Sequence, residues 1–571
     1  MPLGRTAHQL DARIAPTEGT APSEFALTPS QIVRLLIGAV WLYWAQVWIG
    51  VTGLVPLGAA LAVVSAAGSL CIIGAAIAVR GRPAQARLDR LLLVACLLQA
   101  TLQIVVATSW HGYASDELAF DQAAASALIH GFNPYGVNLA AALHQYGVGW
   151  GTPTLGGQVV HSVSYPSLSF LLYIPASLAF GQGSDAGLVT DALAWVIGGA
   201  LLWRMVGESL RPAVALFLIL PIPLLLVGEG ATDPLWLPFV LIAVWRWDRF
   251  GDPAERSMAR WIGPIALGLA CCIKQTPWLL VPFLVAGVGI ESHLRGHSWL
   301  SAGGRYVLIC AAAFLIPNVP FMVWGPGAWL TGVLLPLRTA LVPFGIGPAE
   351  LVSAYGLGGG NLGLFVLSGA VLTLAALVIF VRCYGRLKPL FPLLPLLGVL
   401  LETRSLMSYF VFTIPVVIIA ATTAAATPWA MPHRRLAAGL AVGGGVLATA
   451  SAGLLVAALA VPPPLTITVQ SARVESSRLL ADVTVANHGG QPVRVHFILA
   501  VTGTSEQVMS FTSGPAVLEA GAHASYALAA TDQTPLPTPG YPFQFQLTST
   551  RPEMLAVTPQ LTLGSGGALS P

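Results

Sequence analysis

Charged residues are scarce in this chain of 571 residues. Lys, Arg, Asp and Glu together make up 9% of it, whereas hydrophobic residues make up 55%, and the mean hydropathy is +0.76. A soluble core could not absorb so much apolar sequence, so we predict a polytopic α-helical membrane protein surrounded by membrane lipids. The chain also lacks a basic stripe with interleaved aromatic residues, so nucleic acid is not an expected partner.

Cysteine is rare as well, and the few cysteines lie in apolar surroundings. The six are Cys71, Cys96, Cys271, Cys272, Cys310 and Cys383. Their spacing matches neither a disulfide framework nor a metal site. We therefore interpret them as buried thiols.

The apolar stretches between residues 31 and 461 predict about thirteen transmembrane helices. Loops rich in Arg and Lys are assigned to the cytoplasm, which places the N-terminus inside and the C-terminus outside a plasma membrane. Residues 1–30 lack the layout of a signal peptide and predict a disordered cytoplasmic tail. The apolar segment 165–180 is short and contains prolines, so we expect an interfacial or re-entrant helix rather than a crossing.

The loop 109–185 is predicted to lie outside and to be functional, because it is too long for a plain connection. After three consecutive prolines, residues 462–571 change to short alternating runs separated by turn residues. This pattern predicts a small extracytoplasmic β-sandwich. It shows no cluster of catalytic residue types, so we interpret the sandwich as a spacer or stability module.

Three carboxylates, Asp116, Glu117 and Asp121, stand beside the membrane in the outer loop. Ser115 is suited to cap a short helix there, and the run that starts at Gly131 would end it. Acidic residues in a first turn complement the helix dipole, so their role can be purely structural. Carboxylates are also what acid–base chemistry on a lipid-borne substrate requires. From these residues alone, both interpretations stay open.

Only three cations of the membrane region are predicted on the outer side: Lys274, Arg338 and Arg404. Each could be an interfacial side chain that reaches water, but charges at membrane depth also mark function. The carboxylates on the same face are Asp116, Glu117, Asp121, Glu229 and Asp233. Cations and carboxylates together suit a lipid phosphate that leaves and a hydroxyl that loses a proton.

The motifs in this region are short but occur in a recognisable order. They are Asp116-Glu117 with Phe120, then Gly131-Phe132-Asn133-Pro134-Tyr135, Tyr165-Pro166, Asp233-Pro234, Lys274, and Arg404-Ser405 near Tyr409. This order resembles the GT-C superfamily of glycosyltransferases that use polyprenyl-phosphate sugars. The Asn-Pro-Tyr ending is most similar to the mannosyltransferase branch. The resemblance covers roughly residues 90–425 and implies a GT-C-like fold.

The resemblance also implies roles for individual residues. Asp116 would be the catalytic base that deprotonates the acceptor hydroxyl, and the donor phosphate would be held by Lys274 and Arg404. The other residues expected to bind substrate are Glu117, Asp121, Tyr135, Tyr165, Asp233 and Arg338. Members of the superfamily often work without a metal, although some relatives place a divalent cation at such carboxylates, so no cofactor is expected.

The leading hypothesis is an inverting glycosyltransferase that works on the outer face of the membrane. It would move mannose or another hexose from a polyprenyl-phosphate donor to a lipid, polysaccharide or protein acceptor. The alternative is a transporter or flippase for a lipid-linked or small polar substrate. A transporter would favour internal repeats and helices broken near the midplane, and we find no clear repeat. A third hypothesis is an inactive scaffold that presents its sandwich to cell-wall partners.

Overall fold

The structure of the chain is a computed structural model. It describes residues 27–50, 58–111, 113, 115–149, 151–181, 183–252, 259–423, 434–475, 478–501, 506–530, 537, 539–564 and 567–569. The tail predicted for residues 1–30 lies, up to residue 26, outside these ranges.

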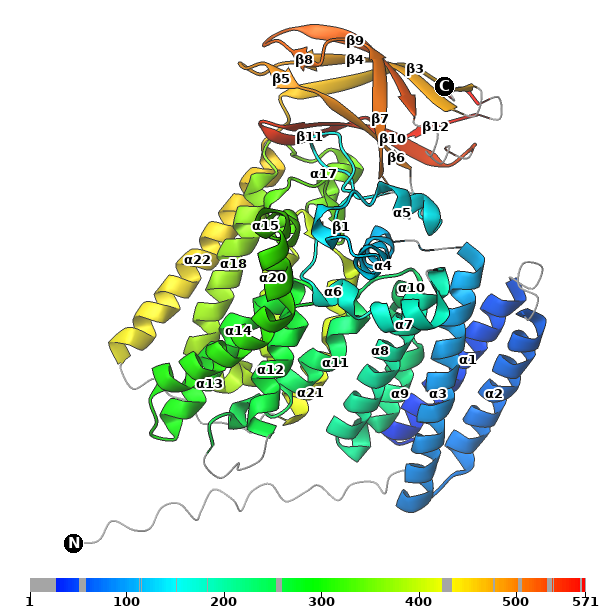
Figure 1. The fold of residues 1–571 in the computed structure, drawn as a ribbon, viewed down its shortest axis with the longest axis vertical. Helices are drawn as coiled ribbons and strands as arrows, with labels where there is room; N and C mark the ends of the chain where they lie inside the picture. Colours follow the sequence, from blue (N-terminus) through cyan, green and yellow to red (C-terminus); the bar gives the residue numbers. More distant parts are fainter. Residues whose placement is uncertain are drawn as a thin grey trace, which may run out of the picture. The chain divides into compact units, whose positions relative to one another are not determined.

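The part of the chain before the three consecutive prolines is helical (Figure 1). Its α-helices and 3₁₀-helices (η) are α1 (Pro29–Gly50), α2 (Gly58–Ala78), α3 (Arg82–His111), α4 (Asp116–Ile129), η1 (Pro134–Gly136), α5 (Ala140–Gln145), α6 (Leu168–Leu171), α7 (Ile174–Phe180), α8 (Ser184–Met205), η2 (Glu208–Leu210), α9 (Arg211–Ile219), α10 (Pro221–Gly228), α11 (Asp233–Val244), η3 (Trp247–Arg249), α12 (Ala259–Cys271), η4 (Thr276–Leu280), α13 (Val281–Leu294), α14 (Trp299–Trp324), α15 (Pro326–Val333), α16 (Leu335–Arg338), α17 (Glu350–Tyr355), α18 (Gly363–Arg382), α19 (Tyr384–Leu387), η5 (Lys388–Leu393), α20 (Leu394–Val399), α21 (Met407–Thr423) and α22 (Arg434–Ala460).

Eight helices of the described chain are long and apolar enough to cross a membrane, and nine if the bent pair η2–α9 and α10 forms one crossing. The eight spans are Pro29–Gly50, Gly58–Ala78, Arg82–Val106, Ala186–Met205, Thr276–Leu294, Trp299–Trp324, Gly363–Arg382 and Arg435–Ala460. These helices support the prediction of a membrane protein, because about 20 apolar residues are needed to span the hydrocarbon core.

The candidates do not reach the predicted number of thirteen. The four remaining segments contain α11, α12, α20 and α21, which are shorter. These segments contain prolines, each of which removes a backbone hydrogen-bond donor. Pro238, Pro264 and Pro415 lie inside α11, α12 and α21, and Pro392 and Pro395 interrupt the segment of η5 and α20.

The chain divides into two compact units, which we describe separately. The first contains the residues up to Val94 together with Ser209–Leu216. In it, α1 and α2 form a hairpin in which Trp41 packs closely against Gly68. A buried ion pair joins Arg34 of α1 to Asp89 of α3, with Nε 2.7 Å from Oδ1. This pair compensates two charges that would be costly alone in an apolar environment.

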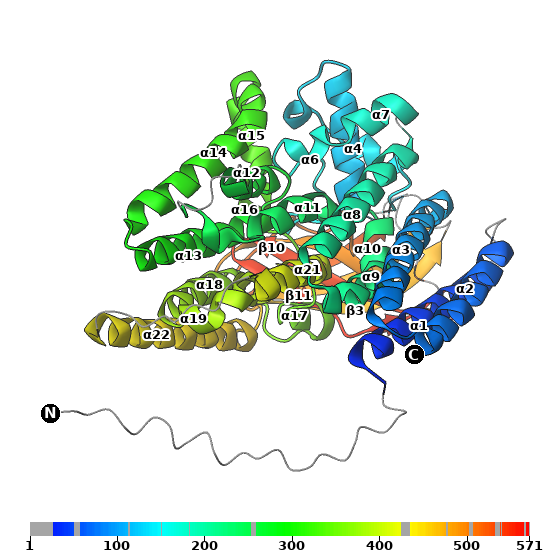
Figure 2. The same cartoon turned by 90° about the horizontal axis from the view of Figure 1, so that it is seen from below.

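The second unit contains residues 95–208 and 217–571, and it holds every residue of the candidate site. Its longest helices pack in pairs, and Figure 2 shows α18 and α22 running side by side. Two serines join this pair, since the Ser451 hydroxyl donates to the carbonyl of Ser368 at 2.9 Å. The apolar segment 165–180 contains only the short helices α6 and α7.

The C-terminal part is a region of antiparallel strands, hereafter the β region. Its strands are β3 (Leu465–Glu475), β4 (Arg478–Asn487), β5 (Val493–Arg494), β6 (His496–Val501), β7 (Glu506–Ser513), β8 (Val517–Leu518), β9 (His523–Ala530), β10 (Pro542–Thr550), β11 (Glu553–Val557) and β12 (Leu561–Thr562). Eight of them form one sheet in the order β11-β10-β6-β7-β9-β4-β3, in which β12 also pairs with β10, and β5 pairs with β8.

The sequence correctly predicted C-terminal strands, but their arrangement differs from two stacked sheets. The single sheet curls around its own core, since Leu465 from one end of the strand order and Met554 from the other share one apolar cluster. Strand β10 is buried along nearly its whole length, on both faces. Alternating residues Phe543, Phe545 and Leu547 fill the core of the β region, so the opposite face of β10 is covered by something else.

Candidate functional site

The helix that carries the carboxylates, α4, begins as predicted. The side-chain oxygen of Ser115 accepts a hydrogen bond from the backbone N–H of Glu117 at 3.1 Å, which caps the first turn. The helix ends shortly before Gly131, whose φ of +83° suits glycine. Asp116 and Glu117 therefore lie in the first turn. Asp121 lies one turn further along, on the side of Glu117.

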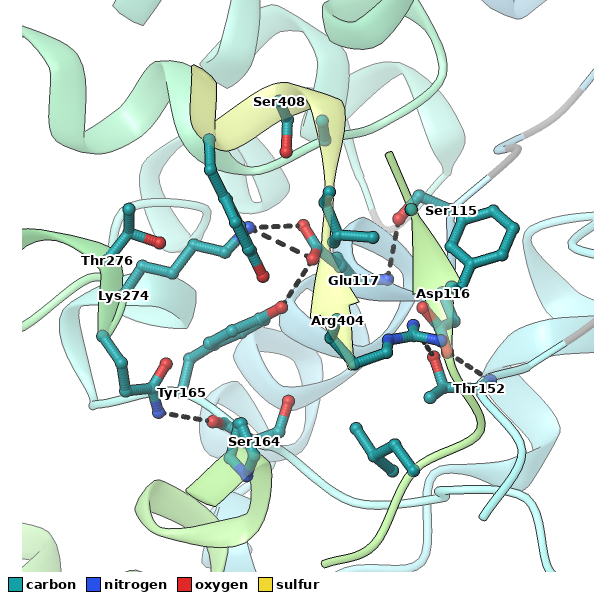
Figure 3. Close-up of a pocket in the computed structure, with 18 of the residues that line it drawn as sticks. Ser115, Asp116, Glu117, Thr152, Ser164, Tyr165, Lys274, Thr276, Arg404 and Ser408 are labelled. Carbon is teal, nitrogen blue, oxygen red and sulfur yellow. Dashed lines mark hydrogen bonds and ion pairs between the residues drawn. The ribbon is translucent and has the colours of Figure 1, made fainter. Parts of the chain in front are cut away.

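A cavity of about 580 Å³ lies against this helix. Its polar lining includes Asp121 together with Asp116, Glu117, Thr152, Tyr165, Lys274 and Arg404, which Figure 3 shows. Apolar residues from more distant parts of the chain also line it: Leu337, Leu341, Phe344, Ile346, Leu406 and Met407. The cavity therefore offers both charged groups and an apolar wall, a combination that suits an amphiphilic ligand.

Lys274 lies in a buried cluster with two carboxylates and two aromatic rings. Its Nζ donates to both carboxylate oxygens of Glu117, at 3.1 and 2.9 Å, and to Oδ2 of Asp233 at 2.9 Å. The Tyr165 and Tyr409 rings lie 5.3 and 5.2 Å from the ammonium. The Tyr165 hydroxyl also donates to Glu117 Oε1 at 2.7 Å. With Lys274 only 1% exposed, all three N–H donors are directed to protein groups.

This cluster changes the interpretation of Lys274, which was expected to hold a donor phosphate. Burial alone would lower the pKa of Lys274, but the charges of Asp233 and Glu117 raise it above its ordinary value. Burial would likewise raise the pKa of Glu117, yet the Lys274 charge and the Tyr165 hydroxyl hold it below its usual range. The Lys274 ammonium therefore already has hydrogen-bond partners, and the two carboxylates, Glu117 and Asp233, compensate its charge. In this geometry it holds Glu117 in place.

A second group joins Asp116 to Arg404 through Thr152 (Figure 3). The backbone N–H of Thr152 donates to Asp116 Oδ2 at 2.7 Å, and a guanidinium nitrogen of Arg404 donates to the Thr152 hydroxyl at 3.4 Å. Arg404 also contacts the Val342 carbonyl at 3.4 Å and lies 5.3 Å from the centre of the Phe344 ring. Within the described residues, Arg404 forms no ion pair. It is thus the cation of this cavity that can bind an anionic ligand.

Two short strands position Arg404. β2 (Arg404–Ser405) pairs in parallel with β1 (Phe344–Gly345), although almost sixty residues separate them in the sequence. Gly345 permits the pairing, because its φ is +138° and a Cβ atom there would lie 2.3 Å from the Ser405 carbonyl oxygen. The backbone N–H of Gly347 donates to the Ser405 hydroxyl at 2.7 Å, which closes this local arrangement.

Asp116 and Asp121 experience different environments. Burial raises the pKa of Asp116, whereas the hydrogen bonds from Thr152 and the charge of Arg404 lower it, with a net increase. Burial raises the pKa of Asp121 to about 8. The Ser169 hydroxyl donates to Asp121 Oδ1 at 2.9 Å, and its Oδ2 has no hydrogen-bond partner among the described residues. A pKa of about 8 favours the protonated, neutral form of Asp121 at pH 7.

Three predicted residues, Asp233, Tyr135 and Arg338, do not line the cavity. Asp233 is fully buried, where it accepts the hydrogen bond from Lys274. The Tyr135 hydroxyl donates to the backbone carbonyl of Tyr165 at 2.9 Å, so Tyr135 supports a lining residue from behind. Arg338 ends α16 with its side chain exposed, whereas the adjacent Leu337 belongs to the lining. Glu229 lines the cavity, as expected from its predicted position on the outer face.

Sequence reasoning missed Thr152, the residue that joins the predicted base to the predicted cation. Thr152 lies in an irregular segment with no recognisable motif, and the only available signal was its place in the long outer loop.

No protein-family model, curated protein or solved structure matches this chain. The assignment of a function therefore depends on the geometry of the site.

Carboxylates such as these are also ligands for divalent cations. Among the residues that the structure describes, no three His, Cys, Asp or Glu side chains are placed to hold a metal ion. Glu117 and Asp233 already bind the Lys274 ammonium. The expectation that no cofactor is needed remains a prediction.

Proposed function

We propose that the chain is an inverting glycosyltransferase that transfers a sugar from a polyprenyl-phosphate donor to an acceptor hydroxyl on the outer face of a plasma membrane. One observation carries the proposal. A carboxylate, Asp116, and a guanidinium that forms no ion pair among the described residues, Arg404, are joined by Thr152 in a cavity with an apolar wall. The proposal includes a GT-C-like fold with about thirteen crossings, in which the shorter helices also cross, and mannose or another hexose as the sugar.

In this mechanism the acceptor oxygen attacks the anomeric carbon, and the bond between that carbon and the phosphate oxygen breaks. Asp116 accepts the proton of the acceptor hydroxyl, which requires its carboxylate form. Arg404 stabilises the charge that develops on the departing polyprenyl phosphate. Because one displacement occurs, the configuration at the anomeric carbon inverts, so a β-linked donor gives an α-linked product. Glu117, held by Lys274, is placed to orient the acceptor or the sugar.

The variant Arg404→Gln tests the donor site. Losing a charged hydrogen bond to phosphate costs about 1.5–3 kcal/mol, so we expect the KM for donor to rise about tenfold to a hundredfold in a radiolabelled transfer assay. Arg338→Gln is the matched control, because this arginine is exposed outside the lining, and its donor KM should equal that of wild type. An equal donor KM in the two variants would remove Arg404 from the donor site.

Proteoliposomes that contain the wild-type chain separate the proposed function from its alternative. Polyprenyl-phosphate sugars are supplied on one side, and both sugar transfer and movement of the intact donor across the bilayer are followed. Transfer to an acceptor supports the glycosyltransferase. Movement of intact donor without transfer supports the transporter or flippase instead.

The pH dependence of transfer provides a second test. Because the base acts as a carboxylate, kcat/KM should fall as the pH is lowered through the pKa of Asp116. Burial raises that pKa above the ordinary aspartate value of 3.8, so the acidic limb should lie at a higher pH than for a solvated aspartate. A rate that is independent of pH down to about 4 would show that no raised carboxyl participates.

A further inference from the structure

The β region is in close contact with the helical part of the same unit, and this contact explains the buried outer face of β10. The residues that alternate with its core positions are Gln544, Gln546 and Thr548, all at most 8% exposed. Gln544 donates to the backbone carbonyl of Ser353 in α17. Thr548 donates its hydroxyl proton to the carbonyl of Leu155 at 3.0 Å. Gln544 and Thr548 therefore bind helical-part backbone rather than water, whereas Gln546 donates to Glu506 of β7 at 3.2 Å.

An apolar cluster and backbone pairing reinforce the contact. Leu155 and Val342 of the helical part pack in one buried cluster with Ile498 of β6 and Leu555 of β11. The backbone N–H of Leu555 donates to the Gly359 carbonyl at 2.9 Å. A domain that served only as a spacer would have no need of a buried, hydrogen-bonded interface. Of the two roles that we predicted for the β region, spacer or stability module, this geometry favours the second.

The segment that lies at this interface is a small hairpin, residues 151–160. Its two arms pair through hydrogen bonds from Thr154 N to Gln158 O at 2.8 Å and from Val160 N to Thr152 O at 2.9 Å. At its tip, a Cβ atom on Gly157 would lie 2.5 Å from the His496 ring of β6, so the turn fits closely against the β region. The tip of the 151–160 hairpin is thus held against strand β6 of the β region.

The opposite end of the 151–160 hairpin forms part of the cavity. There Thr152 donates its backbone N–H to Asp116 and accepts a hydrogen bond from Arg404 through its hydroxyl. The distance from Thr152 to the contact at Leu155 is only three residues. The two arms of this short hairpin are joined by backbone hydrogen bonds. Contacts that fix its tip therefore also restrict the position of Thr152 in the cavity.

We propose that the β region is a structural part of the reaction site: β6 and β10 hold the 151–160 hairpin so that Thr152 positions Asp116 and Arg404. This inference rests on the proposed function and deepens it. Thr152 is a positioning residue, since it acts through the base and the cation. The contribution of the β region is to keep the carboxylate and the guanidinium at a fixed separation, which transition-state stabilisation requires.

Thr548→Val tests the anchoring in the full chain, reconstituted into phosphatidylethanolamine–phosphatidylglycerol nanodiscs. The variant keeps the shape of the side chain but leaves the buried Leu155 carbonyl without its donor, so we expect the amides of residues 151–160 to exchange about tenfold faster with deuterium. The matched control is Thr512→Val, which removes an exposed hydroxyl that bonds Ala527 within the β region. Its hairpin amides should exchange at the wild-type rate.

The same pair of variants has a catalytic readout that a merely structural contact would not change. Hydrogen bonds from Thr152 lower the pKa of Asp116, so a loosened hairpin should move the acidic limb of transfer to higher pH. The limb should move in Thr548→Val and stay in place in Thr512→Val. Unchanged hairpin exchange together with an unchanged acidic limb in Thr548→Val would overturn the proposal.

Thr152 itself offers a second test that does not depend on the β region folding normally. Thr152→Ser keeps the hydroxyl that Arg404 contacts, whereas Thr152→Val removes it. We expect the KM for donor to rise several-fold in the valine variant, with rescue by serine; equal values in the two variants would overturn the role of Thr152. If wild type transfers sugar from no donor, the proposed function fails, whereas the exchange experiment still decides whether the β region anchors the hairpin.

Discussion

Replacing Asp116 by Asn is expected to lower sugar transfer by about a hundredfold to ten-thousandfold, the usual contribution of a general base. The amide keeps the size of the side chain, and its oxygen can still accept the hydrogen bond from Thr152 N. The fold should therefore survive, and only the ability to accept a proton is lost. The measurement is the initial rate of radiolabel transfer at matched protein amounts.

The loss should appear mainly in kcat, because the base acts on the acceptor proton in the transition state. Asp482→Asn is a suitable control, since this aspartate is exposed in the β region and contacts Ser471 and the exposed Arg473 on the neighbouring strand. It should transfer at the wild-type rate. If Asp116→Asn and wild type transfer equally fast, Asp116 serves the helix dipole, and the base lies elsewhere.

Local features of the site could be predicted because their causes lie within a few residues. The Ser115 cap and the start of α4 follow from hydrogen bonds between neighbours in the chain. The change from helices to strands near residue 462 follows from the change in hydrophobic periodicity. Both predictions used signals that a single sequence contains.

The partners in the site could not be predicted in the same way. Lys274 and Glu117 are 157 residues apart, and only the packing of α4 against the segments around α11 and α12 decides that they pair. Charge alone suggested a phosphate ligand, because the sequence does not show that two carboxylates already occupy the ammonium. Thr152 could not be recognised from a motif, because it binds Asp116 through its backbone N–H, a group that almost every residue has. The hydrogen bond from Thr548 to Leu155 also depends on tertiary structure, because 393 residues separate the two in the sequence.

The number of crossings could not be read from the sequence, because a window of apolar residues does not show where a regular helix begins and ends. The helices α11 and α12 are shorter than the eight candidate spans. The first begins at Asp233, and the second ends shortly before Lys274. The irregular backbone at these ends is where the charged cluster forms, in line with the rule that unpaired backbone at membrane depth lines a cavity or is buried in protein.

The other large effect is expected for Lys274→Met. The substitution leaves Glu117 and Asp233 buried without their shared cation, and breaking a buried ion pair in this way costs about 3–5 kcal/mol. We expect a matching decrease in unfolding free energy, measured by sodium dodecyl sulfate titration in mixed micelles, and loss of transfer because Glu117 is no longer held. A decrease below about 1 kcal/mol would show that the cluster contributes little to the fold.

Replacing Glu117 and Asp233, which Lys274→Met leaves without a cation, by amides separates the effect on stability from the effect on function. In the triple variant Lys274→Met, Glu117→Gln and Asp233→Asn, no uncompensated charge remains, so most of the lost unfolding free energy should return. Transfer should stay low, because an amide at position 117 cannot replace the carboxylate that orients the substrate. Recovery of transfer in the triple variant would mean that Glu117 and Lys274 only support the fold.

The pH dependence of Lys274→Met follows from the same charges. Without the ammonium, burial should raise the pKa of Glu117 in the folded state above its unfolded value of about 4. The folded state then binds protons more tightly than the unfolded state, so its stability falls as the pH rises above about 4. The stability deficit relative to wild type should therefore be smallest in acid and grow towards neutral pH. A deficit that is constant between pH 4 and 7 would instead indicate lost packing around the Lys274 side chain.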